Sequence, residues 1–438
     1  MGFVGQLLAF VSSIYGIVFI SLLLWLVAKV NKDIRYLWLL LAFLMYFSSL
    51  AKFFDQWTDE PPALIPFLQT IRDNGRPLSI LTLIGIVISI HKNKYKLFNG
   101  LYVNNESSIQ FLVVVQVIIF LKILLVGNML FAIMAFATFL GVIYIVRNGL
   151  SPLIQNQASI EYGVYAILIA NIIFLTTNFY QAYIDMYPIT FLHGRFLGTT
   201  GNPQHAAVLL ASSIPAYMYM ISRYKISLRM AFICVFLGLN IYALILTGSR
   251  TGLLMAFITV SLFIYKGSPL LTTLTAFCAI IILVFYDEIN LYIALNDETS
   301  TAFGRLSSLE DTRSAAWKGM WETFTYHPIF GKPVIGDRIG FGENSWLATA
   351  SSLGLIGFIP LFLFGTRLIK LSIIALKQSF SKSINNSDEY KVVATGIISL
   401  IAGSFFEAFL LGNLSFSLII LLLYITMLEY LIGRSVTN

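Results

Sequence analysis

The chain has 438 residues, of which 58% are hydrophobic and only 11% are charged. A soluble domain of this length could not bury so much apolar surface, so the composition excludes a soluble protein and indicates one embedded in a lipid bilayer. The net charge of +7 is explained by the lysines and arginines of cytoplasmic loops, so nucleic acid is not expected as a partner.

Apolar segments long enough to cross a bilayer recur along the whole chain. A hydrocarbon core about 30 Å thick needs about 20 helical residues, and helices satisfy their own backbone hydrogen bonds in lipid. We therefore expect an all-α integral membrane protein with about 12–14 transmembrane helices and a best count of about 13. The first segment is expected to be retained, since it has no charged start and no small-residue cleavage site. The expected spans are 3–28, 34–52, 77–91, 108–126, 129–146, 161–179, 204–222, 230–247, 251–265, 269–286, 344–365, 392–411 and 414–432.

Basic residues set the orientation of these spans. They are concentrated in the connections 29–35, 92–96, 222–229 and 366–391. Counting alternate spans places all of these connections on one side, which the positive-inside rule assigns to the cytoplasm. The long connections on the opposite side are 53–76, 180–203 and 287–343.

The connection 287–343 is the largest soluble element of a chain that otherwise forms one membrane domain, 1–438. Within it, RLSSLEDTRSAAWKGMWETF (305–324) brings leucine, tryptophan, methionine and phenylalanine side chains to one face at helical spacing. This pattern predicts an amphipathic helix that lies on the outer membrane surface.

The sequence lacks the motifs of several common nucleotide-binding, metal-binding and catalytic sites. There is no P-loop, no Asp-x-Asp and no Gly-x-Ser-x-Gly, and the four histidines lack metal-ligand spacing. The two cysteines, Cys234 and Cys278, lie in apolar runs and are expected to be packing residues. Neither a metal nor a cofactor is therefore expected.

Arginines on the side opposite the basic loops are the first candidates for a site. Arg195 lies in HGRFLGTTGNPQHAA, Arg250 lies in TGSRTG, and Arg305 and Arg313 flank the acidic LEDT. The planar guanidinium suits phosphate oxygens, and an arginine at membrane depth needs a compensating partner. Each also has a simpler interpretation: Arg250 could snorkel to headgroups, Arg195 could be an ordinary loop charge, and Arg313 could anchor at the interface.

Three further charged residues lie in or beside apolar segments. Glu343 follows a glycine-rich turn and leads into the span 344–365, so it could be a general base facing the arginines or simply a helix cap. Lys122 and Glu407 lie inside expected spans, and an internal ion pair is the simplest interpretation of each.

Four motifs together resemble the O-antigen ligase and polymerase family (the Wzy and WaaL type). They are RFLGTTGNPQHAAVLLA, LTGSRTGLL, TRSAAWKGMWETFTYHPIFG and ENSWLATASSLGLIGF, and they cover about residues 195 to 358. The resemblance implies an inverting, metal-independent glycosyltransferase with a helical, GT-C-like architecture in the bacterial inner membrane, with its active site facing the periplasm. It also implies an undecaprenyl-pyrophosphate-linked oligosaccharide as donor and allows for a chain-length regulator in the same membrane.

The resemblance also assigns roles to residues. It implies that Arg195, Arg250 and Arg313 hold the lipid pyrophosphate and that Glu343 assists as base, with His327 the next candidate. The remaining residues that it places in contact with the pyrophosphate or the sugar are Arg305, Asn202, His327 and Asn344.

The acceptor decides between the activities of this family. Ligases of this type have histidine where this chain has Glu343, which favours a polymerase that extends a lipid-linked repeat unit. The alternative is a ligase that transfers glycan to lipid A–core or to a protein. A flippase or other transporter is a second alternative, although the expected inverted repeats and paired broken helices are not seen in the sequence.

Overall fold

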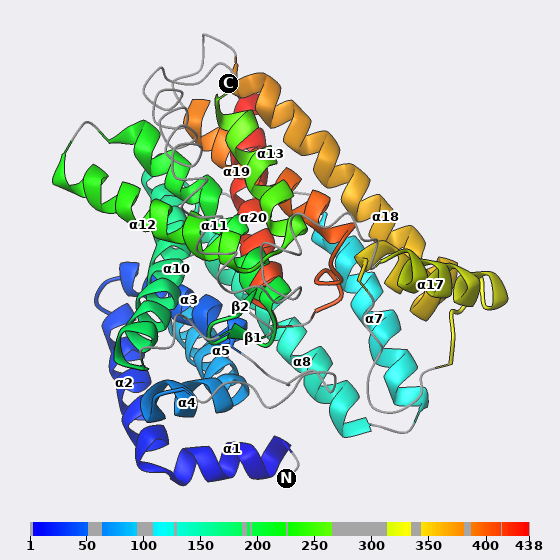
Figure 1. The fold of residues 1–438 in the computed structure, drawn as a ribbon, viewed down its shortest axis with the longest axis horizontal. Helices are drawn as coiled ribbons and strands as arrows, with labels where there is room; N and C mark the ends of the chain where they lie inside the picture. The colour runs from blue at the N-terminus through cyan, green and yellow to red at the C-terminus, as the bar shows by residue number, and fades with distance from the viewer. Residues whose placement is uncertain are drawn as a thin grey trace, which may run out of the picture.

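The computed structural model describes residues 3–50, 64–93, 108–126, 129–185, 191–192, 195–224, 227–264, 313–333, 343–380, 387–412 and 414–437. In these ranges the chain is almost entirely helical, which confirms the prediction of an all-α protein (Figure 1). The expected span 269–286, Arg305 and most of the connection 287–343 lie outside the described residues.

The first half of the chain forms a group of helices around α3 and α10. Its elements are α1 (Phe3–Ser12), α2 (Ile14–Val30), α3 (Arg35–Ser49), α4 (Pro66–Asp73), α5 (Gly75–Lys92), α7 (Ile109–Leu125), α8 (Met129–Ile145), the π-helix η1 (Val146–Leu150), α9 (Ser151–Leu153) and α10 (Gln157–Asp185). Helix α3 packs against both α10 and α5, and α5 packs in turn against α2 and α8.

The second half adds a short hairpin and the helices that carry the four motifs. Its elements are β1 (Phe191–Leu192), β2 (Arg195–Phe196), α11 (Pro203–Arg223), α12 (Leu228–Leu246), α13 (Arg250–Ile264), α17 (Ser314–Tyr326), α18 (Ser345–Ser379), α19 (Ser387–Ser404) and α20 (Phe416–Thr437). The two strands pair antiparallel, with Leu192 opposite Arg195.

Seven of the described helical segments are long and apolar enough to cross a membrane. They are Gly75–Lys92, Met129–Leu153, Gln157–Ile184, Pro203–Arg223, Leu228–Leu246, Ser345–Ser379 and Phe416–Gly433, and the helices α2, α3, α7 and α13 are shorter apolar ones. Large apolar side chains such as Leu24, Val235 and Phe257 are mostly exposed. Such a surface is stable against lipid but not against water, which indicates an all-α membrane protein.

Several expected helix boundaries are wrong. The span expected at 344–365 is longer, because α18 continues to Ser379, into the expected connection 366–391. The segment 3–28 is not one helix, because it breaks at Ser13, whose side chain accepts a hydrogen bond from the Gly16 N–H and starts α2. Figure 1 shows α1 turning away from the direction of α2. The span expected at 392–411 ends earlier, because α19 stops at Ser404 and the chain turns with the Glu407 N–H bonded to the Gly403 carbonyl. Glu407 therefore lies in a turn beyond the helix.

The amphipathic helix expected at 305–324 is observed as α17, from Ser314 to Tyr326. It begins later than expected, with Arg313 at its N-cap position. One face of it packs against protein, since α17 contacts α18 and the Trp317 ring lies 6.0 Å from the ring of Phe406.

Helix α11 is the centre of the second half. It packs against α10, α12, α13 and α19, and nearly all of its residues are buried. A chain of buried polar side chains joins it to its neighbours: the Tyr217 hydroxyl donates to Asn171 Oδ1 at 2.7 Å, and Asn171 Nδ2 donates to Asn240 Oδ1 at 2.9 Å. Asn240 Nδ2 donates in turn to the Leu210 carbonyl at 3.0 Å. Satisfied polar contacts of this kind fix the register of apolar helices.

Helix α18 is broken at Gly354, whose φ of 65° lies in the left-handed region. The HPIFG turn after α17 fills the break: the Leu355 N–H donates to the Pro328 carbonyl and the Lys332 N–H donates to the Ser351 carbonyl, each at 2.8 Å. A side chain on Gly354 would lie 2.2 Å from the Ile329 carbonyl oxygen, so only glycine permits this approach.

Lys122 of α7 also binds at the junction between the HPIFG turn and α18. Its ammonium donates to the Lys332 carbonyl at 2.8 Å and to the Ser352 carbonyl. The bonds satisfy one carbonyl oxygen of α18 just before the break and one of the segment that follows the HPIFG turn. The contacts of Lys122 are therefore hydrogen bonds to carbonyls rather than the ion pair considered from the sequence.

Candidate functional site

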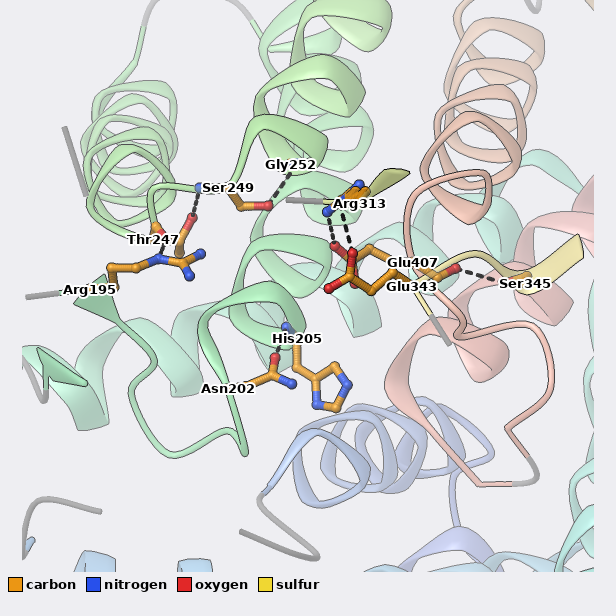
Figure 2. Close-up of polar contacts among 10 residues, drawn as sticks. All are labelled: Arg195, Asn202, His205, Thr247, Ser249, Gly252, Arg313, Glu343, Ser345 and Glu407. Atoms are coloured by element: carbon orange, nitrogen blue, oxygen red, sulfur yellow. Dashed lines mark hydrogen bonds and ion pairs between the residues drawn. The ribbon is translucent and has the colours of Figure 1, made fainter. Parts of the chain in front are cut away.

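Five chain segments meet at one end of the bundle. They are the hairpin with Arg195, the turn between α12 and α13, the residues that begin α17 and α18, and the turn after α19. They meet because α13 packs against α11 and α19, and α19 packs against α18. Figure 2 shows the side chains that these segments bring together.

Arg195 is held in strand β2 and is almost fully buried. Its Nε donates to the Thr247 carbonyl oxygen at 2.7 Å, so the hairpin is tied to the turn between α12 and α13 (Figure 2). Because the bond uses Nε, the guanidinium is fixed in orientation by one edge of its planar fork.

The turn between α12 and α13 presents Arg250. Gly248 takes a φ of 58°, and the Ser249 hydroxyl accepts from the Gly252 N–H at 3.3 Å, as a helix N-cap does. Arg250 is the first residue of α13 and is exposed, which confirms that it lies at a helix end. The turn therefore combines a helix N-terminus with a cation, an arrangement that favours anions.

Arg313 stands between two carboxylates. Its Nη2 lies 2.8 Å from Glu407 Oε1, and its Nε lies 3.5 Å from Glu343 Oε2 (Figure 2). The guanidinium also lies over the ring of Phe406, 5.6 Å from its centre. Arg313 thus contacts two carboxylates and an aromatic ring of the protein, which an interfacial anchor alone does not require.

Glu343 is not the cap of α18. The cap is Asn344, whose Oδ1 accepts from the N–H groups of Trp346 at 2.8 Å and Leu347 at 3.0 Å. The Glu343 side chain is 40% exposed, and its Oε2 makes no hydrogen bond among the described residues although Arg313 is near. The capping interpretation is therefore wrong for Glu343, and its carboxylate is available for chemistry.

Glu407 is the residue of this site that sequence reasoning did not place. Its backbone carbonyl accepts from the Ser345 hydroxyl at 2.7 Å, which ties the turn after α19 to the start of α18. Burial raises the pKa of its carboxyl to about 7, against the opposing effect of Arg313, while Glu343 raises it further and Arg195 lowers it. The only sequence signal for it was an acid in an otherwise apolar segment.

Other residues expected at the site lie elsewhere or serve the backbone. Asn202 caps α11, since its Oδ1 accepts from the His205 N–H at 2.8 Å, and Asn344 caps α18. His327 follows the last residue of α17, and the rise of a helix puts it about 20 Å from Arg313 along the axis. His205 is exposed and lies beside the site in Figure 2, although it was not among the residues expected there.

The arrangement suits an anionic ligand, with a carboxylate nearby that could accept a proton. Cationic side chains come from three separate segments, and a partly exposed carboxylate lies beside one of them. No protein-family model and no curated protein sequence matches this chain. Its function is therefore argued from the site and from the motifs that build it.

Proposed function

We propose that this chain is an O-antigen or surface-polysaccharide polymerase with about 13 spans and a GT-C-like arrangement. It transfers the growing glycan from undecaprenyl pyrophosphate to a sugar hydroxyl of an incoming lipid-linked repeat unit. The active site faces the periplasm, because the basic connections define the opposite side as cytoplasmic.

The observation that carries this proposal is the convergence of the motifs. Arg195, Arg250, Arg313 and Glu343 come from four separate motifs. Arg195 is bonded to Thr247 in the turn before Arg250, Arg313 lies 3.5 Å from Glu343, and both Arg195 and Arg313 act on Glu407. Motifs that shared only hydropathy with a known family would have no reason to meet at one place. A charge cluster at a helix end also suits a ligand whose charged group lies at the membrane surface.

The reaction follows from the charges. The acceptor hydroxyl oxygen attacks the anomeric carbon, and the bond from that carbon to the pyrophosphate oxygen breaks with its electron pair going to the oxygen. The arginines stabilise the negative charge that develops there, as preorganised donors do in other transfer reactions. The acceptor proton passes to the Glu343 carboxylate, whose exposure leaves it within reach of a substrate.

The decisive experiment is the product formed by purified protein. Wild-type protein in detergent is incubated with a lipid-pyrophosphate-linked repeat unit, and the products are separated by length. A polymerase forms chains of several repeats from this single substrate, whereas a ligase forms none without its separate acceptor and a flippase forms none at all. Absence of any chain longer than one repeat would refute the polymerase proposal.

The surface glycan of a deletion strain gives the matching result in cells. A strain without this chain should carry single capped repeats, and complementation should restore a ladder of lengths. Free core without any glycan would instead identify a ligase, so the two experiments separate the activities independently.

A further inference from the structure

The Arg313 guanidinium already faces two carboxylates along its Nε–Nη2 edge. Glu407 binds Nη2 at 2.8 Å and Glu343 approaches Nε at 3.5 Å. A carboxylate and a phosphate compete for the same fork of donors, because both present two oxygens to it. A pyrophosphate can therefore take this edge of Arg313 only if one of these carboxylates gives up its contact.

The charge balance at the site also favours the loss of one carboxylate charge when the pyrophosphate binds. Three arginines (Arg195, Arg250 and Arg313) and two carboxylates leave a formal net charge of +1. A pyrophosphate diester carries two negative charges. One added proton raises the charge of the site to +2, which matches the ligand, whereas binding without a proton leaves excess negative charge in a partly desolvated place.

Glu407 is better placed than Glu343 to take that proton. Its side chain is 14% exposed against 40% for Glu343, and it lies outside the helices, in the turn after α19. The charged groups that face it are Arg313, Glu343 and Arg195, and burial outweighs the two arginines. The pKa of about 7 means that its protonation is nearly balanced at neutral pH.

We propose that Glu407 holds Arg313 when the site is empty, and that binding of the donor pyrophosphate is coupled to the uptake of one proton by Glu407, which releases Arg313 to the ligand. The proposal rests on the proposed function for the identity of the ligand. It assigns Glu407 as a positioning residue that acts through Arg313, while Glu343 keeps the role of base.

The coupling predicts how affinity depends on pH. If one proton is taken up on binding, the dissociation constant rises about tenfold per pH unit well above pH 7 and becomes constant well below it. The probe is a short-chain prenyl pyrophosphate sugar diester, whose two phosphates each keep one charge from pH 6 to 9. Binding to purified wild-type protein in detergent is measured over that range.

Variants assign the proton. Glu407→Gln should bind the probe with an affinity that no longer depends on pH. Glu343→Gln should keep the tenfold change per pH unit, with its onset at lower pH, because Glu343 raises the pKa of Glu407. Glu322→Gln is the matched control. Glu322 is exposed on α17, the helix that begins after Arg313, and its replacement should leave the pH dependence of binding as in the wild type. If Glu343→Gln abolishes the dependence and Glu407→Gln retains it, the proton belongs to Glu343 and the assignment is wrong.

Calorimetry of the wild type tests the coupling without any variant that could misfold. Titrations at pH 8 in buffers of different ionisation enthalpy should show nearly one proton taken up per bound probe, and at pH 6 almost none. Binding without proton uptake at pH 8 overturns the coupling but leaves the proposed function standing. Failure of the probe to bind at any pH overturns the proposed function and the coupling together.

Discussion

Gly331→Ala tests whether the HPIFG turn holds Arg313 in place through helix α17. Gly331 has a φ of 68° and is packed against the broken part of α18. A methyl group there would lie 2.4 Å from the Ser352 carbonyl carbon and 2.5 Å from the Leu353 nitrogen. These are backbone atoms, so the turn itself must move away.

The magnitude follows from what the junction loses. The left-handed conformation costs alanine about 1–2 kcal/mol. Two of the backbone hydrogen bonds that join the turn to α18 are 2.8 Å long, and each contributes about 1 kcal/mol. The junction is therefore weakened by about 3 kcal/mol, which is enough to release a short segment.

The assay combines the length distribution of the surface glycan with limited proteolysis of the purified protein. Gly331→Ala should shorten the glycan ladder and speed up cleavage near the HPIFG turn, because α17 and Arg313 at its start lose their anchor. The control is Gly319→Ala, in the middle of α17, where an added methyl group meets nothing within 4 Å and should leave both readouts unchanged. A full ladder and wild-type cleavage in Gly331→Ala, or equal damage in both variants, would refute this role of the junction.

Four further predictions concern charges and topology. Arg250→Ala should abolish glycan chains longer than one repeat and Arg250→Lys should leave little activity, because lysine lacks the planar fork; full activity in Arg250→Ala would restore the snorkelling interpretation. Glu343→Gln should lower turnover about a hundredfold or more with donor binding retained, and Glu343→His should keep partial activity; wild-type ladders from Glu343→Gln would show that it is not the base. The raised pKa of Glu407 means that the folded protein keeps a proton that the unfolded chain loses, so wild-type stability should fall by about 3 kcal/mol as pH rises from 4.5 to 7. Thermal unfolding in detergent should show this slope in the wild type and not in Glu407→Gln; an equal slope in both would mean that another group titrates. In intact cells, an impermeant thiol reagent should label a cysteine placed near Thr299 and not one near Asn385, and the reverse pattern would invert the topology.

The membrane helices were predictable because an apolar run of sufficient length has few alternatives in lipid. Most observed helices coincide with expected spans within a few residues at each end, α11 and α12 among them. Breaks inside such runs were not predictable. Ser13 splits the first run with a single hydroxyl, and Gly354 breaks α18 only because the HPIFG turn and Lys122 satisfy the freed backbone groups. Each break depends on partners that are distant in the sequence.

In the candidate site, too, local features were predictable and contacts between distant residues were not. The placement of Arg250 at a helix end follows from the local turn, since glycine and serine precede it, and the sequence was sufficient for that. The contact of Arg313 with Glu407 was not predictable, because it joins residues that are 94 positions apart and depends on α19 ending early. Apolar periodicity cannot place the end of a helix when apolar residues continue past it, as they do after Ser404.

The structure shows which of two neighbouring residues, Glu343 or Asn344, caps α18. In sequence either residue could cap α18, and a carboxylate at a helix start is stabilising in any protein. Asn344 is uncharged, yet its side-chain oxygen accepts hydrogen bonds from the Trp346 and Leu347 N–H groups. The start of α18 is thus capped without Glu343. The Glu343 carboxylate, which lies 3.5 Å from an arginine, is therefore not needed to cap α18. The neighbouring cap is therefore what makes a chemical role for Glu343 consistent with a stable start of α18.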